Sequence, residues 1–189
     1  MSNIYISSDL HLFHNKEFLY KSRNFDNITE MNHTIIDNFN SIVKPEDDLY
    51  LLGDLLLGGG DRLEDGLGLL TWLNGKLHLV RGNHDSNKRW EAYSTLSNVV
   101  EQENAIFLKY NKYHLFLSHF PSICTNYDDK KLKQCTINLC GHTHALNPFI
   151  DMEKGLIYHC EVDTNNCYPW LLDDIIENIK EYIQIKEKG

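Results

Sequence analysis

Short runs of apolar residues alternate along the chain with longer segments in which apolar residues recur at helical spacing. The apolar runs at 3–8, 48–53, 76–81, 113–118, 136–140 and 156–162 predict strands. Several of these runs lack alternation, which is typical of strands covered on both faces. The pattern predicts a layered α/β fold with sheet inside and helices outside.

Three segments predict helices. Apolar residues recur at helical spacing over 28–39, and Asn27 followed by Glu30 resembles a capping box at the start of that segment. Residues 63–73 form a second helix candidate, although two glycines interrupt it, and 171–183 carries a clear amphipathic stripe. We expect the aliphatic stripes to pack in the core.

Length and composition favour one globular domain spanning 1–189, with 42% hydrophobic residues to form its core. The N-terminal segment lacks the features of a signal peptide, and no apolar run reaches the length of a membrane helix. The five cysteines include no CxxC spacing, which indicates reduced thiols. We therefore expect a cytoplasmic protein without a membrane association, and the sequence leaves its oligomeric state open.

The charge balance disfavours one class of function. Lysine and arginine number 18 against 27 acidic residues, a formal net charge of −9. A chain this acidic is poorly suited to holding nucleic acid by general neutralisation of phosphates. If the protein acts on a phosphate, the positive charge that binds this phosphate must come from a local site.

Five of the predicted strands end in short clusters of Asp, Asn and His. The residues in these clusters with metal-binding side chains are Asp9, His11, Asp54, Asn83, His119, His142 and His144. Loops at the carboxyl ends of strands converge on one edge in layered α/β folds, so these side chains are expected to meet there. Two pairs, Asp9 with His11 and His142 with His144, are two residues apart and so face the same side in extended backbone.

The side chains of this set are imidazoles, carboxylates and one carboxamide, with no thiolate. They suit divalent Mn, Fe, Zn, Ni or Co rather than a structural Cys-rich zinc site. Seven ligands are too many for one tetrahedral ion and enough for two ions that share a ligand. Two ions about 3.5–4 Å apart are the usual arrangement for hydrolysing phosphate esters.

The ordered series D-x-H, G-D, G-N-H-D, S-H and G-H-x-H from Asp9 to His144 resembles the calcineurin-like metallophosphoesterase superfamily, and in particular its small, cap-less bacterial and phage members. The resemblance implies a four-layer α/β/β/α sandwich. It implies that Asp9, His11 and His144 hold one ion, that Asn83, His119 and His142 hold a second, and that Asp54 bridges both. His84 would face the scissile phosphate, where it would stabilise its oxygens or protonate the leaving group.

The resemblance further implies a dinuclear metal-dependent phosphoesterase in which a metal-bridging hydroxide attacks phosphorus, with His84 and Asp54 in the catalytic machinery and manganese among the suitable metals.

Protein serine/threonine phosphatases of the superfamily carry G-D-x-V-D-R-G, whereas residues 53–59 read G-D-L-L-L-G-G. A small phosphate ester is the expected substrate, and we slightly favour a diester over a monoester. The alternatives are a metal-dependent nuclease, with nucleic acid bound only as substrate, and a non-catalytic scaffold.

Three further residues are candidate substrate contacts. His14 either lines the phosphate pocket or lies on the surface, and Arg23 either reaches a substrate phosphate or is a solvated arginine. Tyr127, in a polar segment between 120 and 135, is a candidate for stacking on a base or aryl group, and a mobile surface loop is the alternative there. Asp85 either orients His84 or caps the helix that begins near Ser86.

Overall fold

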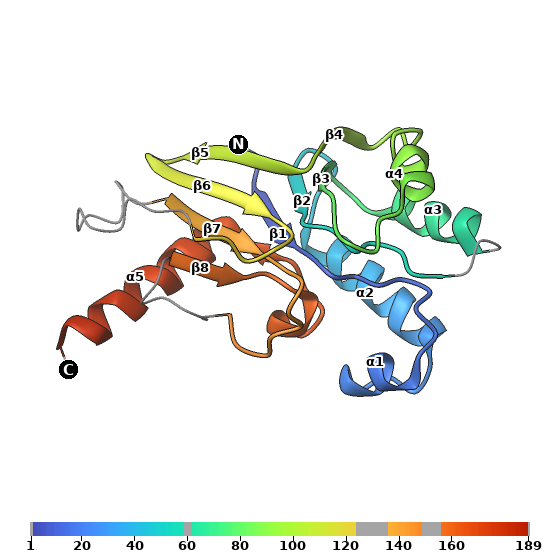
Figure 1. Cartoon of the computed structure of the whole chain (residues 1–189), viewed down its shortest axis with the longest axis horizontal. Coiled ribbons are helices and arrows are strands. Elements are labelled where there is room, and N and C mark those ends of the chain that lie inside the picture. The colour runs from blue at the N-terminus through green and yellow to red at the C-terminus, as the bar shows by residue number, and fades with distance from the viewer. Residues whose placement is uncertain (1, 59–61, 124–135, 149–155, 189) are drawn as a thin grey trace.

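The computed structural model describes residues 2–58, 62–123, 136–148 and 156–188, which form two β-sheets flanked by helices (Figure 1). The first sheet has the order β4-β3-β2-β1-β9 and the second has the order β5-β6-β7-β8. The strands of the first sheet are β1 (Ile4–Ser7), β2 (Asp48–Leu51), β3 (Lys76–Val80), β4 (Val99–Glu103) and β9 (Trp170–Leu171). Those of the second are β5 (Ala105–Tyr110), β6 (Tyr113–Ser118), β7 (Thr136–Cys140) and β8 (Leu156–His159).

Strand direction brings the polar strand ends together. Strands β1 to β4 are parallel, and β9 alone pairs antiparallel to β1. In the second sheet, β5 and β6 form a hairpin whose turn residues Asn111 and Lys112 are left-handed, and β6, β7 and β8 are parallel. An isolated bridge between Ser8 and Glu161 joins the two sheets just beyond the ends of β1 and β8.

The helices lie on both sides of the paired sheets. In Figure 1, α2, α3 and α4 lie on one side of the first sheet, the second sheet lies on the other, and α5 runs beside the second sheet. The helices are α1 (Glu17–Ser22), α2 (Ile28–Ile42), α3 (Leu63–Trp72), α4 (Asn87–Tyr93) and α5 (Leu172–Lys188), with a short 3-10 helix, η4 (Val162–Asn165). None of the helices in these described ranges has the length and apolar character needed to cross a membrane.

Two hydrophobic clusters form the core, one on each face of the first sheet. Leu49 and Leu51 of β2 pack with α2 and α3, whereas Tyr50 and Leu52 face the cluster shared with the second sheet and α5. The alternation within this continuous apolar run buries both faces of the strand, as the sequence predicts. The expected mixed α/β sandwich is confirmed.

Local sequence explains where several elements begin and end. The Asn27 side chain accepts a hydrogen bond from the Glu30 backbone N–H at 3.0 Å, which confirms the N-cap of α2. Glu30 in turn accepts from the backbone of Asp26. The strand expected over 156–162 is too long: it ends at His159, because the chain then crosses to the first sheet and turns into η4.

Candidate metal centre

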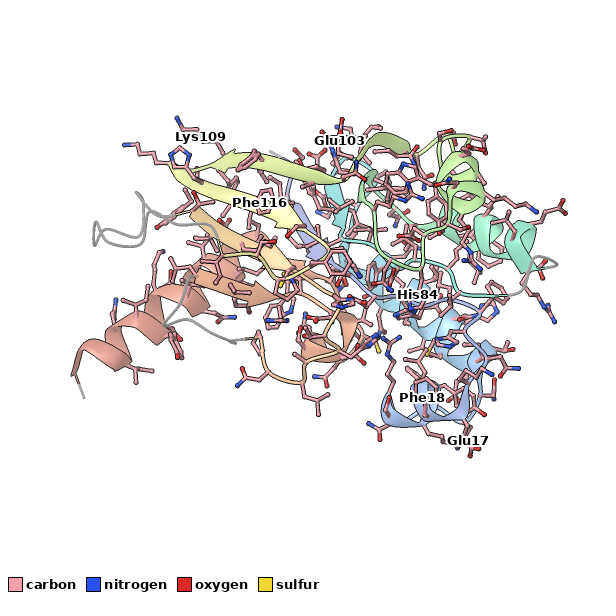
Figure 2. All side chains as sticks on the ribbon, viewed as in Figure 1. Glu17, Phe18, His84, Glu103, Lys109 and Phe116 are labelled. Carbon is pink, nitrogen blue, oxygen red and sulfur yellow. The ribbon has the colours of Figure 1, made fainter. Side chains whose placement is uncertain are left out.

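The seven candidate ligands meet at the carboxyl ends of five strands. Asp9 and His11 follow β1, Asp54 follows β2, and Asn83 follows β3. From the second sheet, His119 follows β6, and His142 and His144 follow β7. Each sheet thus contributes side chains to one cluster, as the strand-end pattern predicts. Figure 2 shows His84, the neighbour of Asn83, near the middle of the molecule, beyond the strands of the first sheet.

Asp9, His11 and His144 form a first group with the spacing of metal ligands. The Nε2 atoms of His11 and His144 lie 3.1 Å apart, and the Asp9 Oδ1 lies 3.5 Å from the first and 3.7 Å from the second. Ligand atoms about 2.1 Å from one ion stand at such separations. Asp9 Oδ1 is buried without a hydrogen-bond partner, whereas Oδ2 accepts from the His142 backbone N–H and the Ser8 hydroxyl. The orphaned oxygen therefore fits a bound cation.

Asn83, His119 and His142 form a second group. Asn83 Oδ1 lies 2.8 Å from His119 Nε2 and 2.9 Å from His142 Nδ1. The other nitrogen of His119 donates to the Leu52 carbonyl at 2.8 Å, which fixes the ring so that Nε2 faces the group. An amide oxygen and two imidazole nitrogens suit a borderline divalent ion.

Asp54 lies between the two groups. Its Oδ2 is 3.8 Å from His11 Nε2 and 3.5 Å from His119 Nε2, one nitrogen from each group. Its Oδ1 accepts a hydrogen bond from the His84 backbone N–H at 2.8 Å, so the carboxylate is held in place. Asp54 therefore has the position of a ligand between the two groups, and Asp9 also offers a ligand atom within 4.8 Å of those of Asp54 and His119.

The electrostatics of the cluster favour the ionised form of Asp9. Burial by itself would raise the pKa of Asp9, but the His11 ring, the imidazole of His119 and the Ser8 hydroxyl outweigh it and lower the pKa below its usual range. Asp9 is fully buried and Asp54 is 2% exposed. Two buried carboxylates and four imidazoles thus meet at one place, and these oxygen and nitrogen donors suit divalent cations.

The candidate ligands lie on strained backbone. Positive φ angles occur at Asp9 (57°), His11 (49°), Asp54 (56°), His142 (78°) and His144 (50°). A left-handed conformation costs a residue other than glycine on the order of 1–3 kcal/mol, and it clusters at functional sites. Backbone bonds hold these turns: Asp9 N–H donates to the Gly53 carbonyl and His11 N–H to the Asp54 carbonyl, both at 3.0 Å. The sequence pattern, which assumes extended backbone here, misses this geometry.

Glycines at two of the motifs make room for these carboxylates. A β-carbon on Gly82 would collide with the carboxylate and backbone of Asp54, and one on Gly141 would collide with Ser8 and Asp9. The glycine of each motif therefore lets its turn pass directly beside a carboxylate, from the neighbouring strand for Gly82 and from the other sheet for Gly141.

His84 stands over the cluster and is partly exposed. Its side chain is 45% exposed, and its Nε2 lies 4.0 Å from Asp54 Oδ2. Its ring meets the His11 ring edge-on, with centroids 5.6 Å apart. The side chain borders the cluster and reaches solvent, a position from which it can contact a bound ligand.

Asp85 has neither of the two roles considered from the sequence. Its carboxylate is 1% exposed and accepts from the backbone N–H groups of Asp54 (2.8 Å) and Gly82 (2.9 Å) and from the Tyr93 hydroxyl (3.0 Å). Burial raises its pKa, although these donors oppose the shift. Ser86 caps α4 instead, by accepting from the Arg89 backbone. Asp85 therefore ties the loops after β2 and β3 to one another.

Arg23 requires a correction. It is 8% exposed rather than solvated, and its guanidinium is occupied by Asp163 and by the carbonyls of Asp9 and Leu10. Every described contact of this group is internal, so the structure gives no support to the predicted contact with a substrate phosphate. Sequence separation hides the pairing, because Arg23 and Asp163 lie 140 positions apart.

The other two candidate substrate contacts differ in outcome. His14 is half-buried beside the cluster, with its ring centroid 5.6 Å from that of His11. Burial and the nearby imidazoles of His11 and His84 lower the pKa of His14 to about 4, so the ring is neutral at neutral pH. A contact between His14 and substrate stays a prediction. Tyr127 lies outside the described residues.

Two acidic residues that follow β8 support the cluster and were not predicted. Asp163 accepts from His144 Nδ1 at 3.1 Å. Glu161 is fully buried and accepts from the backbone N–H and hydroxyl of Thr143, between the two histidines of the last motif. Sequence offers only a weak signal for them, since Glu161 and Asp163 lie at positions where a strand was expected to end.

Comparisons with known proteins agree with this geometry. Residues 2–181 match the family described as calcineurin-like phosphoesterase. An uncharacterized protein of Methanocaldococcus jannaschii is 33% identical over 187 residues, which cover 96% of this chain and 93% of that protein. The gene 66 protein of Mycobacterium phage L5 is 25% identical over 165 residues, covering 77% and 79%.

A solved structure shows the same fold. The crystal structure of a protein of unknown function from Aquifex aeolicus superposes with a TM-score of 0.69 at 22% identity, covering 94% of this chain and 99% of that one. The match over residues 2–181 spans all of the motifs that carry the cluster. The chain therefore belongs to the calcineurin-like phosphoesterase family of metal-dependent hydrolases.

Proposed function

We propose that this protein is a dinuclear phosphoesterase that hydrolyses phosphate esters with two divalent transition-metal ions, and that it slightly favours diesters. The observation that carries the proposal is the position of Asp54, whose Oδ2 lies within 3.8 Å of a nitrogen from each ligand group. A shared carboxylate between two complete sets of ligands is the arrangement for a pair of ions a few ångströms apart.

The distances support an assignment of the ligands to two ions. Asp9, His11 and His144 would hold one ion, Asn83, His119 and His142 the other, and Asp54 both. When bound, such ions polarise the phosphate and activate water at neutral pH. Their charge is the local positive field that an acidic chain needs in order to bind an anionic ester.

His84 is the side chain that we assign to contact the bound phosphate. With 45% of its side chain exposed and its Nε2 close to Asp54, the ring can meet a phosphate bound at the cluster. In its protonated form it would donate a hydrogen bond to a phosphoryl oxygen or a proton to the leaving oxygen. The Asp54 carboxylate holds the backbone of His84 in place beside the cluster.

The surroundings of the cluster favour a diester. Phe120 is 49% exposed and packs against His142 and His119, with ring centroids 4.6 and 5.0 Å apart, on the side of the second group. Phe18 of α1 is 71% exposed and meets His14, which in turn meets His11 of the first group. Figure 2 shows Phe18 on α1, apart from His84. Phe120 beside the second group offers a contact to one substituent of a diester, and Phe18, beyond His14 on the side of the first group, offers a contact to a longer second substituent.

The test is a metal add-back assay. Protein stripped with a chelator is supplied separately with Mn, Fe, Ni, Zn, Co or Mg and offered an aryl monoester, a bis-aryl diester, a cyclic nucleotide and DNA. We expect hydrolysis only with metal, loss of bound metal in Asp54→Asn, and slower turnover with retained metal in His84→Ala. Asp26→Asn is the matched control, because that carboxylate is 88% exposed and pairs only with Lys21.

The outcomes separate the alternatives. Diester turnover below monoester turnover would reverse the substrate preference. Metal-dependent cleavage of DNA that Asp54→Asn abolishes would favour the nuclease instead. No hydrolysis with any metal, together with tight capture of a protein partner, would favour a scaffold.

A further inference from the structure

A buried ion pair lies directly behind the first ligand group. Arg23 Nε donates to Asp163 Oδ1 at 2.8 Å, and a second guanidinium nitrogen donates to Oδ2 at 2.9 Å. The two side chains are 2% and 7% exposed. Arg23 follows the end of α1 and Asp163 lies in η4, so the pair joins segments that are distant in sequence.

Arg23 also holds the turn that carries two candidate ligands. Its terminal nitrogens donate to the carbonyls of Asp9 at 2.8 Å and Leu10 at 3.0 Å. Asp9 and His11 on either side of Leu10 have left-handed backbone, which needs external support. The guanidinium provides that support from beneath the turn.

Asp163 holds the third member of the group. Its carboxylate accepts from His144 Nδ1 at 3.1 Å, which places the proton on Nδ1 and leaves Nε2 free to face Asp9 and His11. A carboxylate behind a ligating histidine sets the ring orientation and raises the basicity of the ligand. One ion pair thus contacts both turns of the first group.

The second group is supported differently. The ring of His119 is oriented by the carbonyl of Leu52, a neutral acceptor, and His142 turns Nδ1 toward Asn83. Behind the first group, by contrast, an ion pair between two residues that are not candidate ligands contacts two ligand-bearing turns.

We propose that Arg23 and Asp163 are positioning residues that assemble the first metal site from the turns after β1 and β7, and that they set metal affinity there without setting it at the second site. This rests on the proposed dinuclear function. A buried ion pair adds little to stability by itself, because desolvation offsets the attraction between its charges. The hydrogen bonds of this pair with two turn carbonyls and with His144 point to placement of ligands as its role.

The test measures metal binding rather than turnover. Wild type, Asp163→Asn, the double variant Arg23→Gln/Asp163→Asn and the control Asp26→Asn are dialysed against graded Mn²⁺, and bound metal per chain is counted. We expect two ions in wild type and control. In Asp163→Asn we expect one ion with unchanged affinity and a second weakened by about 10–100-fold, the range for such outer contacts. The double variant leaves no unpaired buried charge, so it reports the effect in a folded protein even where Asp163→Asn unfolds.

Reference variants assign the weakened site. Asn83→Ala weakens the second site, so adding Asp163→Asn to it should remove the remaining tight ion, whereas adding Asp163→Asn to His144→Ala should change little. Equal loss of both ions, or wild-type affinity at both sites in the folded double variant, would overturn the inference. A wild-type protein that binds fewer than two ions would instead overturn the dinuclear function, so the two failures are distinguishable.

Discussion

The Asp85 carboxylate accepts a hydrogen bond from the backbone N–H of Asp54 at 2.8 Å, and through it the loop after β3 fixes the loop after β2. The same carboxylate accepts from the N–H of Gly82 and from the Tyr93 hydroxyl. The candidate bridging ligand is therefore positioned by an acid that itself faces away from the metal centre.

Replacing Asp85 with alanine is expected to destabilise the fold and weaken metal binding. The change leaves several buried N–H donors unpaired, each at about 1–3 kcal/mol, so we expect a loss of at least about 3 kcal/mol in the free energy of unfolding. Urea denaturation measures it. Tyr93→Phe removes one of the donors and should cost only about 0.5–1.5 kcal/mol. If the free energy of unfolding of Asp85→Ala lies within about 0.5 kcal/mol of wild type, the usual range for a surface substitution, Asp85 does not tie the two loops together.

Adding a methyl group to Gly141 is expected to damage the first ligand group. The new carbon would collide with Ser8 and with the Asp9 carboxylate, so the turn must move, at a cost of about 1–3 kcal/mol. Calorimetric titration with Mn²⁺ should show weaker binding in Gly141→Ala. Gly68→Ala in α3 is the matched control, because a β-carbon there would have no atom within 4 Å apart from its chain neighbours and its own helix backbone. Alanine there should stabilise the helix by about 0.5–1 kcal/mol. Unchanged Mn²⁺ affinity in Gly141→Ala would contradict the close packing.

Alkaline pH is expected to unfold the protein through its buried tyrosines. Burial, with the carboxylates of Asp48 and Glu101 nearby, raises the pKa of Tyr50 to about 12, and burial also raises the pKa of Tyr93 and Tyr158. An unfolded tyrosine ionises near pH 10, so between about pH 10 and pH 12 the unfolded state binds fewer protons than the folded one.

The stabilisation from these tyrosines is therefore complete below about pH 10 and is lost as pH rises toward the folded pKa. Urea denaturation at intervals between pH 9 and pH 12 should show a falling free energy of unfolding. Tyr50→Phe should reduce the slope, since phenylalanine has no proton to lose. A slope that is the same in Tyr50→Phe and in wild type would exclude a contribution from this residue.

Removing the Phe120 ring is expected to weaken diester binding. Contacts to an aromatic ring contribute about 0.5–1.5 kcal/mol, which corresponds to a rise of about 2–10-fold in KM for a bis-aryl phosphate. Turnover at saturation should change little, because Phe120 contacts His119 and His142 only through ring packing. Phe107→Ala is the control, since Phe107 is 79% exposed and packs on Phe116 of the second sheet, and Figure 2 shows Phe116 well away from His84. Equal KM values for Phe120→Ala and Phe107→Ala would show that Phe120 does not contact the substrate.

The main features of the fold and cluster can be predicted from the sequence because they are local. Apolar runs mark the buried strands, and the polar residues that follow them lie at strand ends by necessity. Strands β4 and β5 are missed because each lies at the edge of its sheet and carries many exposed or polar residues, as at Val100 and Phe107. β4 has only two apolar residues before three polar ones, and β5 opens with a short apolar run at 105–108 that the strand prediction does not include.

The parts of the centre that escape prediction depend on contacts between distant segments. Arg23 is an ordinary polar residue in sequence, and only folding places it between Asp163 and the Asp9 carbonyl. Asp85 belongs to a motif, yet its partners Asp54 and Tyr93 are chosen by packing. The left-handed turns are equally hidden, because histidine and aspartate do not mark them as glycine would.

The division of the candidate ligands between the sheets has a consequence for folding. The first group takes Asp9 and His11 from one sheet and His144 from the other, and the second takes Asn83 from the first sheet and both of its histidines from the second. Neither sheet alone carries a complete set. Metal uptake would then report that the two halves have docked, and a change that loosens their packing far from the centre would appear first as a protein that has lost its ions.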